Sequence, residues 1–154
     1  MAAEPHNLPP TPSLCSALRQ ASRAVSRLYD KELRGVGLRT TQYSLLCVVA
    51  RAGPVRQGEL SGQASLDETT LTRNLRPLVD AGWVAARSGA DRREKLVTIT
   101  KAGTAKLAEA RPALERAQAR MRSLLPEGVW QGLMAVLAEV ARFTNHHPQE
   151  VVHE

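Results

Sequence analysis

Residues 67–100 read DETTLTRNLRPLVDAGWVAARSGADRREKLVTIT, and the spacing of their apolar residues changes part-way along. In residues 67–81 the leucines recur every three or four positions, which predicts an amphipathic helix. These leucines are Leu71, Leu75 and Leu78. After the following glycine the period becomes two in residues 83–87 and 95–100, which predicts two strands. Residues 88–93 form a polar turn between them, so this stretch predicts a helix followed by a β-hairpin.

The face of the predicted helix that points away from its leucines carries hydroxyl and guanidinium groups. At about 100° per residue, Thr69, Arg73 and Arg76 lie on that face. Arginine can hold a guanine edge or a phosphate with two hydrogen bonds, and threonine can contact a phosphate or a thymine methyl. Ser65 followed by Glu68 matches a capping box, which predicts that Ser65 is the N-cap. We therefore expect this helix to contact DNA.

The turn of the predicted hairpin is basic, because Arg92 and Arg93 are adjacent in it. Asp91 and Arg93 are two residues apart and can form a salt bridge that holds one guanidinium group in place. A guanidinium group on a thin β-ribbon fits a narrow minor groove, where the negative potential is strongest. The hairpin is therefore predicted to be a wing that contacts DNA.

Three helices are predicted upstream of this stretch. The first covers residues 11–34, with Thr11 as its N-cap and Pro12 at its first helical position. The second covers residues 42–52, and a short third one lies around residues 59–64. The first helix has a one-sided apolar face, so it needs a partner surface.

Two long helices are predicted downstream of the hairpin. Thr100 is expected to cap the first of them, and Pro112 to kink it. Its expected apolar face consists of Leu107, Leu114, Ala117, Met121 and Leu124. The second long helix is expected to begin at Pro126.

Three short helices followed by a two-stranded wing are typical of the winged helix-turn-helix. The sequence predicts a mainly α fold with a small β-wing, in which residues 36–100 form the DNA-binding lobe. The helices in residues 11–35 and 101–145 have apolar faces that a single chain cannot cover, so they are predicted to form the dimerisation region of a homodimer. Residues 1–10 and 146–154 are predicted to be flexible tails.

The charge balance of the chain favours a nucleic-acid partner. Its 154 residues include 21 basic and 15 acidic ones, for a formal net charge of +6. This balance favours double-stranded DNA as the partner, and the alternative is a basic surface without a ligand. No apolar stretch approaches the roughly 20 residues that span a bilayer, and the N-terminus lacks the pattern of a secretory signal. A cytoplasmic protein without membrane contact is expected.

The chain resembles the MarR family of winged helix-turn-helix regulators over roughly residues 13–144. The resemblance is carried by Leu71-Thr72-Arg73, Gly82-Trp83-Val84, Asp91-Arg92-Arg93 and Thr41-Gln42-Tyr43. It implies an obligate homodimer, a palindromic operator, and repression that a small aromatic acid or oxidation relieves. By position, the residues expected at DNA are Thr70, Thr72, Arg73 and Arg76 in the major groove and Arg93 in the minor groove. Pro77 departs from the pattern, because proline inside the recognition helix forfeits a backbone hydrogen bond.

Two explanations of the inducing signal remain open. Cys15 lies near the start of the first helix, where the helix dipole favours a thiolate. Its position resembles the sensing cysteine of the organic-hydroperoxide branch of the family, and Tyr29 matches one tyrosine partner, whereas Thr40 stands where another tyrosine is expected. The alternative is that Cys15 only fills space and that a small aromatic ligand binds between the dimer helices and the winged lobe. Cys47 is predicted to be an ordinary core residue.

Other protein classes find less support in the sequence. It contains no GxSxG, HExxH or phosphate-loop motif, so no enzyme and no cofactor are predicted. Several metal-ligating residues lie close together at the C-terminus, but in a tail without fixed geometry, so no metal site is predicted. These residues are His146, His147, Glu150 and His153. An adaptor that kept the fold without binding DNA is a further alternative, against which the arginines of the helix and wing argue.

Overall fold

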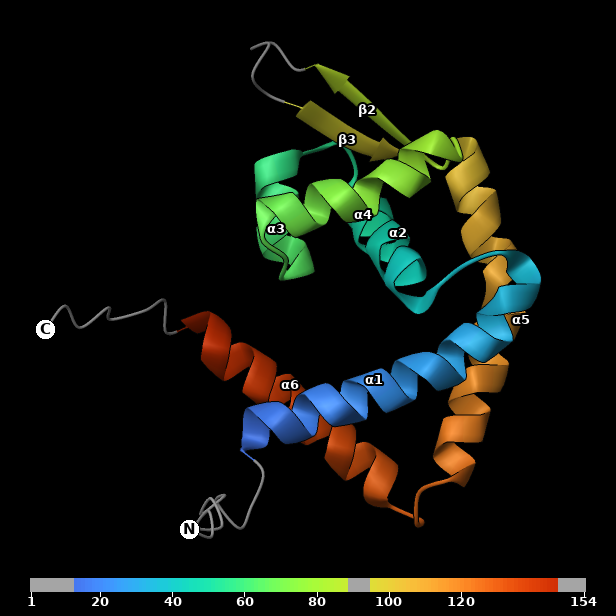
Figure 1. Cartoon of the computed structure of the whole chain (residues 1–154), viewed down its shortest axis with the longest axis vertical. Coiled ribbons are helices and arrows are strands. Elements are labelled where there is room, and N and C mark those ends of the chain that lie inside the picture. The colour runs from blue at the N-terminus through green and yellow to red at the C-terminus, as the bar shows by residue number, and fades with distance from the viewer. Residues whose placement is uncertain (1–12, 89–94, 147–154) are drawn as a thin grey trace, which may run out of the picture. The chain divides into compact units, whose positions relative to one another are not determined.

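The computed structural model describes residues 13–88 and 95–146. Its elements are α1 (Leu14–Leu33), a 3₁₀ helix η1 (Arg34–Val36), α2 (Thr40–Ala52), β1 (Val55–Arg56), α3 (Gln57–Ala64), α4 (Glu68–Asp80), β2 (Val84–Ser88), β3 (Lys95–Ile99), α5 (Lys101–Ser123) and α6 (Val129–His146) (Figure 1). The mainly helical fold with a small antiparallel sheet confirms the predicted fold class. The chain divides into two compact units, Met1–Ala117 and Gln118–Glu154.

The core of the first unit is built from leucines and valines of α2, α3, α4 and the sheet. Leu46, Leu60, Leu71, Leu78 and Val97 are 0% exposed. Burying a leucine stabilises the fold by about 1.5–3 kcal/mol, so this core can hold the helices of the lobe against the hairpin. The predicted inward face of α4 is confirmed, because its three leucines are all buried.

Two predicted N-caps were wrong. Helix α1 begins at Leu14, and Ser13 rather than Thr11 is its N-cap, with its Oγ accepting a hydrogen bond from the Ser16 N–H at 3.2 Å. Helix α4 is capped by Asp67, not by Ser65. Ser65 instead ends α3 in a left-handed conformation with φ of 52°, so its backbone cannot begin the next helix.

The sheet has one strand more than predicted. Strands β2 and β3 form the expected antiparallel hairpin, with Val84 opposite Ile99 and Ser88 opposite Lys95. Strand β1 pairs with the other edge of β3, in the order β1-β3-β2. Two residues are too short to show an alternating pattern, which is why the sequence did not predict β1. Its Val55 is buried and extends the core beneath the wing.

Thr100 caps α5 as predicted, and its hydrogen bonds also connect the hairpin to this helix. Its Oγ accepts a hydrogen bond from the Gly103 N–H at 3.0 Å and donates to the Gly82 carbonyl at 2.7 Å. Gly103 packs so closely that an added Cβ would lie 2.1 Å from the Trp83 carbonyl oxygen. Only glycine fits this contact.

The buried residues of α5 and the start of α6 differ from the prediction. The buried residues of α5 are Gly103, Ala110, Ala113 and Ala117, so of the predicted apolar face Ala117 is buried and Leu107 packs, partly buried, against the core. Helix α6 begins at Val129 rather than at Pro126, which instead accepts a hydrogen bond from the Val129 N–H at 3.2 Å. Large apolar side chains of α6 are exposed: Val129, Leu133, Met134, Val136, Leu137 and Phe143. Within residues 13–88 and 95–146, no helix has the length and apolar character that a membrane span requires.

Candidate DNA interface

The exposed face of α4 carries the predicted DNA-contacting side chains. Thr69, Thr72, Arg73 and Arg76 are all exposed. Arg76 Nε lies 3.9 Å from Asp80 Oδ2, and both side chains are mostly in solvent. Such an exposed pair contributes little, so it leaves the guanidinium group available. No carboxylate in the described part of the chain forms an ion pair with Arg73.

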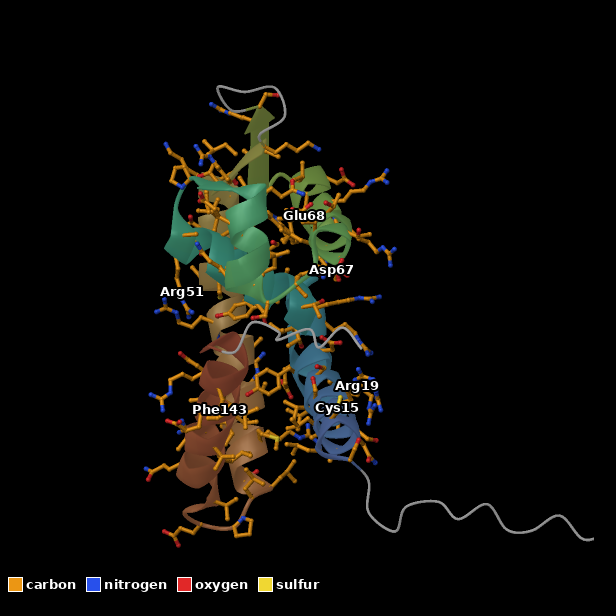
Figure 2. The ribbon with its side chains drawn as sticks, turned by 90° about the vertical axis from the view of Figure 1, so that its left-hand side faces the viewer. Cys15, Arg19, Arg51, Asp67, Glu68 and Phe143 are labelled. Atoms are coloured by element: carbon orange, nitrogen blue, oxygen red, sulfur yellow. The ribbon has the colours of Figure 1, made fainter. Side chains whose placement is uncertain are left out.

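Thr70 belongs to the cap of α4 rather than to its open face. Its hydroxyl donates to Asp67 Oδ2 at 2.6 Å, and its backbone N–H donates to Asp67 Oδ1 at 2.8 Å. Both hydrogen bonds favour the charged carboxylate and lower the pKa of Asp67 below its ordinary value of 3.8. Asp67 and Glu68 lie together at the start of this helix (Figure 2). Their negative charges suit the positive end of the helix dipole.

The groove between α4 and the wing brings in residues that the sequence did not single out. Gln57, the first residue of α3, donates from Nε2 to Thr72 Oγ1 at 2.8 Å. Gln57, Thr72, Arg76 and Lys95 line one cavity of about 240 Å³ with the sheet. The alternation of the hairpin could have indicated Lys95, but no local pattern points to Gln57. The surface therefore combines side chains from α3, α4 and β3.

The strands of the wing are described, but its tip is not. Arg87 and Lys95 are exposed on the strands that lead to the turn. The predicted contacts Arg92 and Arg93 and the salt-bridge residue Asp91 lie outside the described residues. The same holds for the predicted tails, apart from residue 146 at the end of α6.

Cys15 and Tyr29 are not brought together within one chain. Both lie on the straight run of α1, where 14 residues correspond to about 21 Å at 1.5 Å per residue. Cys15 is exposed near the start of this helix (Figure 2), and Tyr29 is half-buried. Contact between the two would therefore need a second copy of the chain. The expectation that Cys47 is an ordinary core residue was wrong, because it is half-buried and lines a cavity.

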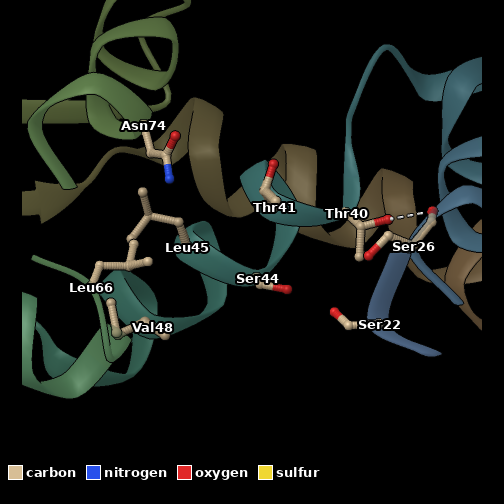
Figure 3. Close-up of a pocket in the computed structure, with 10 residues that line it drawn as sticks. Ser22, Ser26, Thr40, Thr41, Ser44, Leu45, Val48, Leu66 and Asn74 are labelled. Carbon is tan, nitrogen blue, oxygen red and sulfur yellow. Dashed lines mark hydrogen bonds between the residues drawn. The ribbon is translucent and has the colours of Figure 1, made fainter. Parts of the chain in front are cut away.

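A hydroxyl-rich cavity lies between α1, α2 and α4 (Figure 3). Its volume is about 350 Å³, and no charged side chain is among the described residues that line it. The polar lining residues are Ser22, Ser26, Thr40, Thr41, Ser44 and Asn74. Asp30 Oδ1 lies behind this lining and accepts hydrogen bonds from the Thr40 N–H and hydroxyl, both at 2.6 Å. We call this space the hydroxyl cavity.

The comparisons with known proteins agree with this geometry. A model of the MarR family matches residues 38–95, which run from two residues before α2 to the first residue of β3. An uncharacterised HTH-type transcriptional regulator of Bacillus subtilis, YwoH, is 33% identical over 96 residues, which cover 62% of this chain and 70% of that protein.

Solved structures extend the likeness to most of the chain. The M. tuberculosis transcriptional regulator MosR, in complex with DNA, has a TM-score of 0.77 and 31% identity, and covers 88% of this chain and 98% of its own. A mutant of E. coli MarR complexed with operator DNA has a TM-score of 0.74 and 25% identity, and covers 82% of this chain and 92% of its own. The chain therefore belongs to the MarR family of transcriptional regulators, which are non-enzymatic DNA-binding proteins.

Proposed function

We propose that the protein is a repressor that binds a palindromic operator as a homodimer, with α4 in the major groove and the wing in the minor groove. The observation that carries the proposal is the exposed stripe of Thr69, Thr72, Arg73 and Arg76 opposite the buried leucines of α4. Arginine can bind guanine O6 and N7 with two hydrogen bonds, which reads the base rather than the phosphate. Arg92 and Arg93 complete the proposed contacts, with Asp91 holding the wing.

The homodimer is supported by the exposed apolar side chains of α6. Phe143 is 70% exposed and Val136 60% exposed in the single chain. Contiguous apolar surface of this kind marks an interface, and a second copy of the chain presents the same surface in self-complementary form. Two recognition helices related by a two-fold axis would bind successive major grooves about 34–36 Å apart, which requires an inverted repeat.

The experiment is selection of bound duplexes from a random pool, followed by gel shifts on the selected sequence. We expect an inverted repeat, and affinity that falls steeply with salt if about 6–10 phosphates are contacted. Arg73→Ala should cost about 1–3 kcal/mol of binding free energy. The matched control is Arg23→Ala, which removes the same charge from the exposed side of α1. A flat salt response, or wild-type affinity of the Arg73→Ala, Arg93→Ala double variant, would refute the proposal.

The repressor is released by a small phenolic ligand in the hydroxyl cavity. The uncharged polar lining offers hydrogen bonds to a phenol, and Leu45, Val48 and Leu66 offer apolar contact to its ring. The cavity lies between α1 and the recognition helix α4, so a ligand there can change the angle at which α4 is presented. Added phenol should weaken operator binding, and Ser44→Val should reduce this effect.

The alternative signal is oxidation of Cys15, which its exposure supports. An organic hydroperoxide would transfer one oxygen to the thiolate, giving a sulfenic acid and the corresponding alcohol. Operator binding is compared in wild type and Cys15→Ser before and after treatment with the hydroperoxide. Release only in wild type would establish this route, and equal behaviour would leave the phenolic ligand as the signal.

A further inference from the structure

A hydrogen bond joins the start of α3 to the exposed face of α4. Gln57 Nε2 donates to Thr72 Oγ1 at 2.8 Å, across 15 residues of sequence. Gln57 is half-buried and is the first residue of α3, whereas Thr72 is exposed on α4. The two helices lie side by side (Figure 1), and a Cβ added at Gly58 would lie 3.9 Å from Glu68 Oε1. The hydrogen bond therefore lies where α3 meets the first turns of α4.

Both partners of this hydrogen bond are held by buried neighbours on their own elements. Val55, two residues before Gln57, is buried in β1, which pairs with β3. Leu60, three residues after Gln57, is 0% exposed. On α4, Thr72 directly follows Leu71, which is also 0% exposed. Because close packing restricts the backbone on both sides, the Gln57 amide reaches the Thr72 hydroxyl from a fixed direction.

The hydrogen bond leaves the proton of the Thr72 hydroxyl available. A hydroxyl has one proton and two lone pairs, and the Gln57 amide occupies one of the lone pairs. In the described part of the chain, the Thr72 hydroxyl donates to no other group. Thr70 differs, because its hydroxyl already donates to Asp67 Oδ2 at 2.6 Å. Thr72 can therefore donate to a ligand of α4, whereas the proton of Thr70 is used within the cap.

The amide of Gln57 also makes the Thr72 hydroxyl a stronger donor, because hydrogen bonds in a chain polarise one another. In the major groove the acceptors are guanine O6 and N7, adenine N7 and thymine O4. The amino groups of adenine and cytosine are donors in the same groove. A hydroxyl that is prepared as a donor therefore distinguishes bases by the group that faces it.

We propose that Gln57 is a positioning residue that makes Thr72 a hydrogen-bond donor, so that Thr72 selects a base with an acceptor facing it in the major groove. The inference rests on the proposed function, because it assigns a base preference to one of the exposed side chains of α4. If Gln57 only stabilised the lobe, its removal would change the affinity for every duplex by the same factor. The pattern of base preference therefore separates the two roles.

The experiment measures binding of duplexes that carry each of the four base pairs, in turn, at every position of the selected half-site. Thr72→Val removes the hydroxyl and keeps the shape of the side chain, so the position at which preference is lost is the one that Thr72 reads. Gln57→Met keeps the length of the side chain without its N–H. It should reduce the preference at that same position about three- to tenfold and leave the other positions unchanged.

A second variant, Gln57→Glu, reverses the direction of the hydrogen bond at nearly constant shape. The introduced carboxylate accepts the Thr72 proton, so the remaining lone pairs of Thr72 Oγ1 face the base. Preference at the position read by Thr72 should then shift toward adenine or cytosine, whose amino groups donate. The added negative charge weakens binding of all duplexes, and comparing base pairs within one variant removes this common factor.

Gln63→Met is the matched control, because it makes the same substitution at an exposed position of the same helix. It should leave the base preference unchanged. In the Thr72→Val chain, Gln57→Met should cause no further loss of preference, since Gln57 acts through Thr72. Thermal unfolding of each variant checks that the lobe is folded, which the similar size of the exchanged side chains leads us to expect.

Three outcomes would overturn the proposal: unchanged preference in Gln57→Met, equal weakening of all duplexes in Thr72→Val, or an unchanged preference for acceptors in Gln57→Glu. Equal weakening would mean that Thr72 contacts a phosphate, where it carries no sequence information. Wild-type selectivity that survives in Gln57→Met would reject this inference and keep the proposed function. A wild-type protein without any preferred duplex would reject the proposed function, and this inference with it.

Discussion

In the winged lobe the large apolar side chains face inward, whereas on α6 they face solvent. Leu46 and Leu71 are 0% exposed, but Met134 is 50% and Phe143 70% exposed. None of residues 129–143 is buried. Because burial of an apolar side chain is what stabilises a fold, the lobe supplies its own core and α6 needs another surface. The lobe therefore folds on itself, whereas α6 leaves large apolar side chains exposed, which is why we propose it as the surface for assembly.

The largest expected effect comes from making the same substitution, leucine to alanine, in the winged lobe and on α6. Leu46→Ala leaves a cavity in the core of the lobe and should lower the free energy of unfolding by about 2–5 kcal/mol. Leu137→Ala removes the same atoms from the open face of α6. It should leave the lobe intact and raise the dimer dissociation constant. Chemical denaturation measures the first effect, and analytical ultracentrifugation measures the second.

The distinction between the lobe and α6 would be refuted if Leu46→Ala and Leu137→Ala had the same effects on the free energy of unfolding and on dimer dissociation. A large loss of stability in Leu137→Ala without a change in dimer dissociation would place that side chain in a core of its own chain. A well-folded wild-type monomer at micromolar concentration would remove the assigned role of α6 altogether.

The second effect uses one glycine from each region. An alanine Cβ at position 103 would meet the Trp83 carbonyl oxygen at 2.1 Å and Ile99 Cγ1 at 2.8 Å, whereas at Gly132 it would meet no atom within 4 Å. Gly103→Ala should therefore destabilise the lobe by about 1–3 kcal/mol despite the higher helix propensity of alanine. Gly132→Ala should stabilise α6 by up to about 1 kcal/mol. Thermal unfolding of both variants measures whether each substitution stabilises or destabilises the protein. A stabilising effect of Gly103→Ala would contradict the packing described.

The smallest effect concerns the N-cap of α4 in acid. The folded pKa of Asp67 is lowered, so its contribution to stability is complete above the unfolded pKa and is lost as the pH falls through the folded value. Asp67→Asn keeps a capping acceptor without the charge, so it should stay folded and lose this acid dependence. Asp67→Ala should lose the cap at every pH. Unfolding curves of the three proteins between neutral pH and strong acid provide the measurement, and an identical acid dependence in Asp67→Asn would refute the assignment.

Local periodicity was enough to predict the elements that carry the proposed DNA contacts. The leucine spacing in residues 67–81 located the buried face of α4, and the change of period located the hairpin to within one residue at its described ends. The cap was wrong because Ser65 and Asp67 both suit an N-cap by residue type. The choice between them depends on where α3 ends, which is a matter of backbone conformation.

The cavities could not be predicted, because their walls come from distant parts of the sequence. Cys47 lies on α2 and Arg111 on α5, and only the packing of these helices brings the two into one space. The hydrogen bond from Gln57 to Thr72 could not be predicted for the same reason, whereas β1 was missed because two residues are too short to show an alternating pattern. Sequence periodicity identifies the face of a helix, but the partner of that face is a property of the fold.

The hydroxyl group of Thr100 couples the movement of α5 to the movement of the hairpin. The same hydroxyl holds the turn after α4 through the Gly82 carbonyl and the first turn of α5 through the Gly103 N–H. The Thr100 N–H also donates to the Trp83 carbonyl at 3.0 Å, and Lys106 of α5 lies 5.2 Å above the Trp83 ring. These interactions surround the close contact between Gly103 and the Trp83 carbonyl, which leaves no room for a Cβ atom. Because of them, α5 cannot tilt at this end without moving the base of the wing. A rotation of α5 is therefore coupled to the position of the hairpin that is proposed to contact DNA.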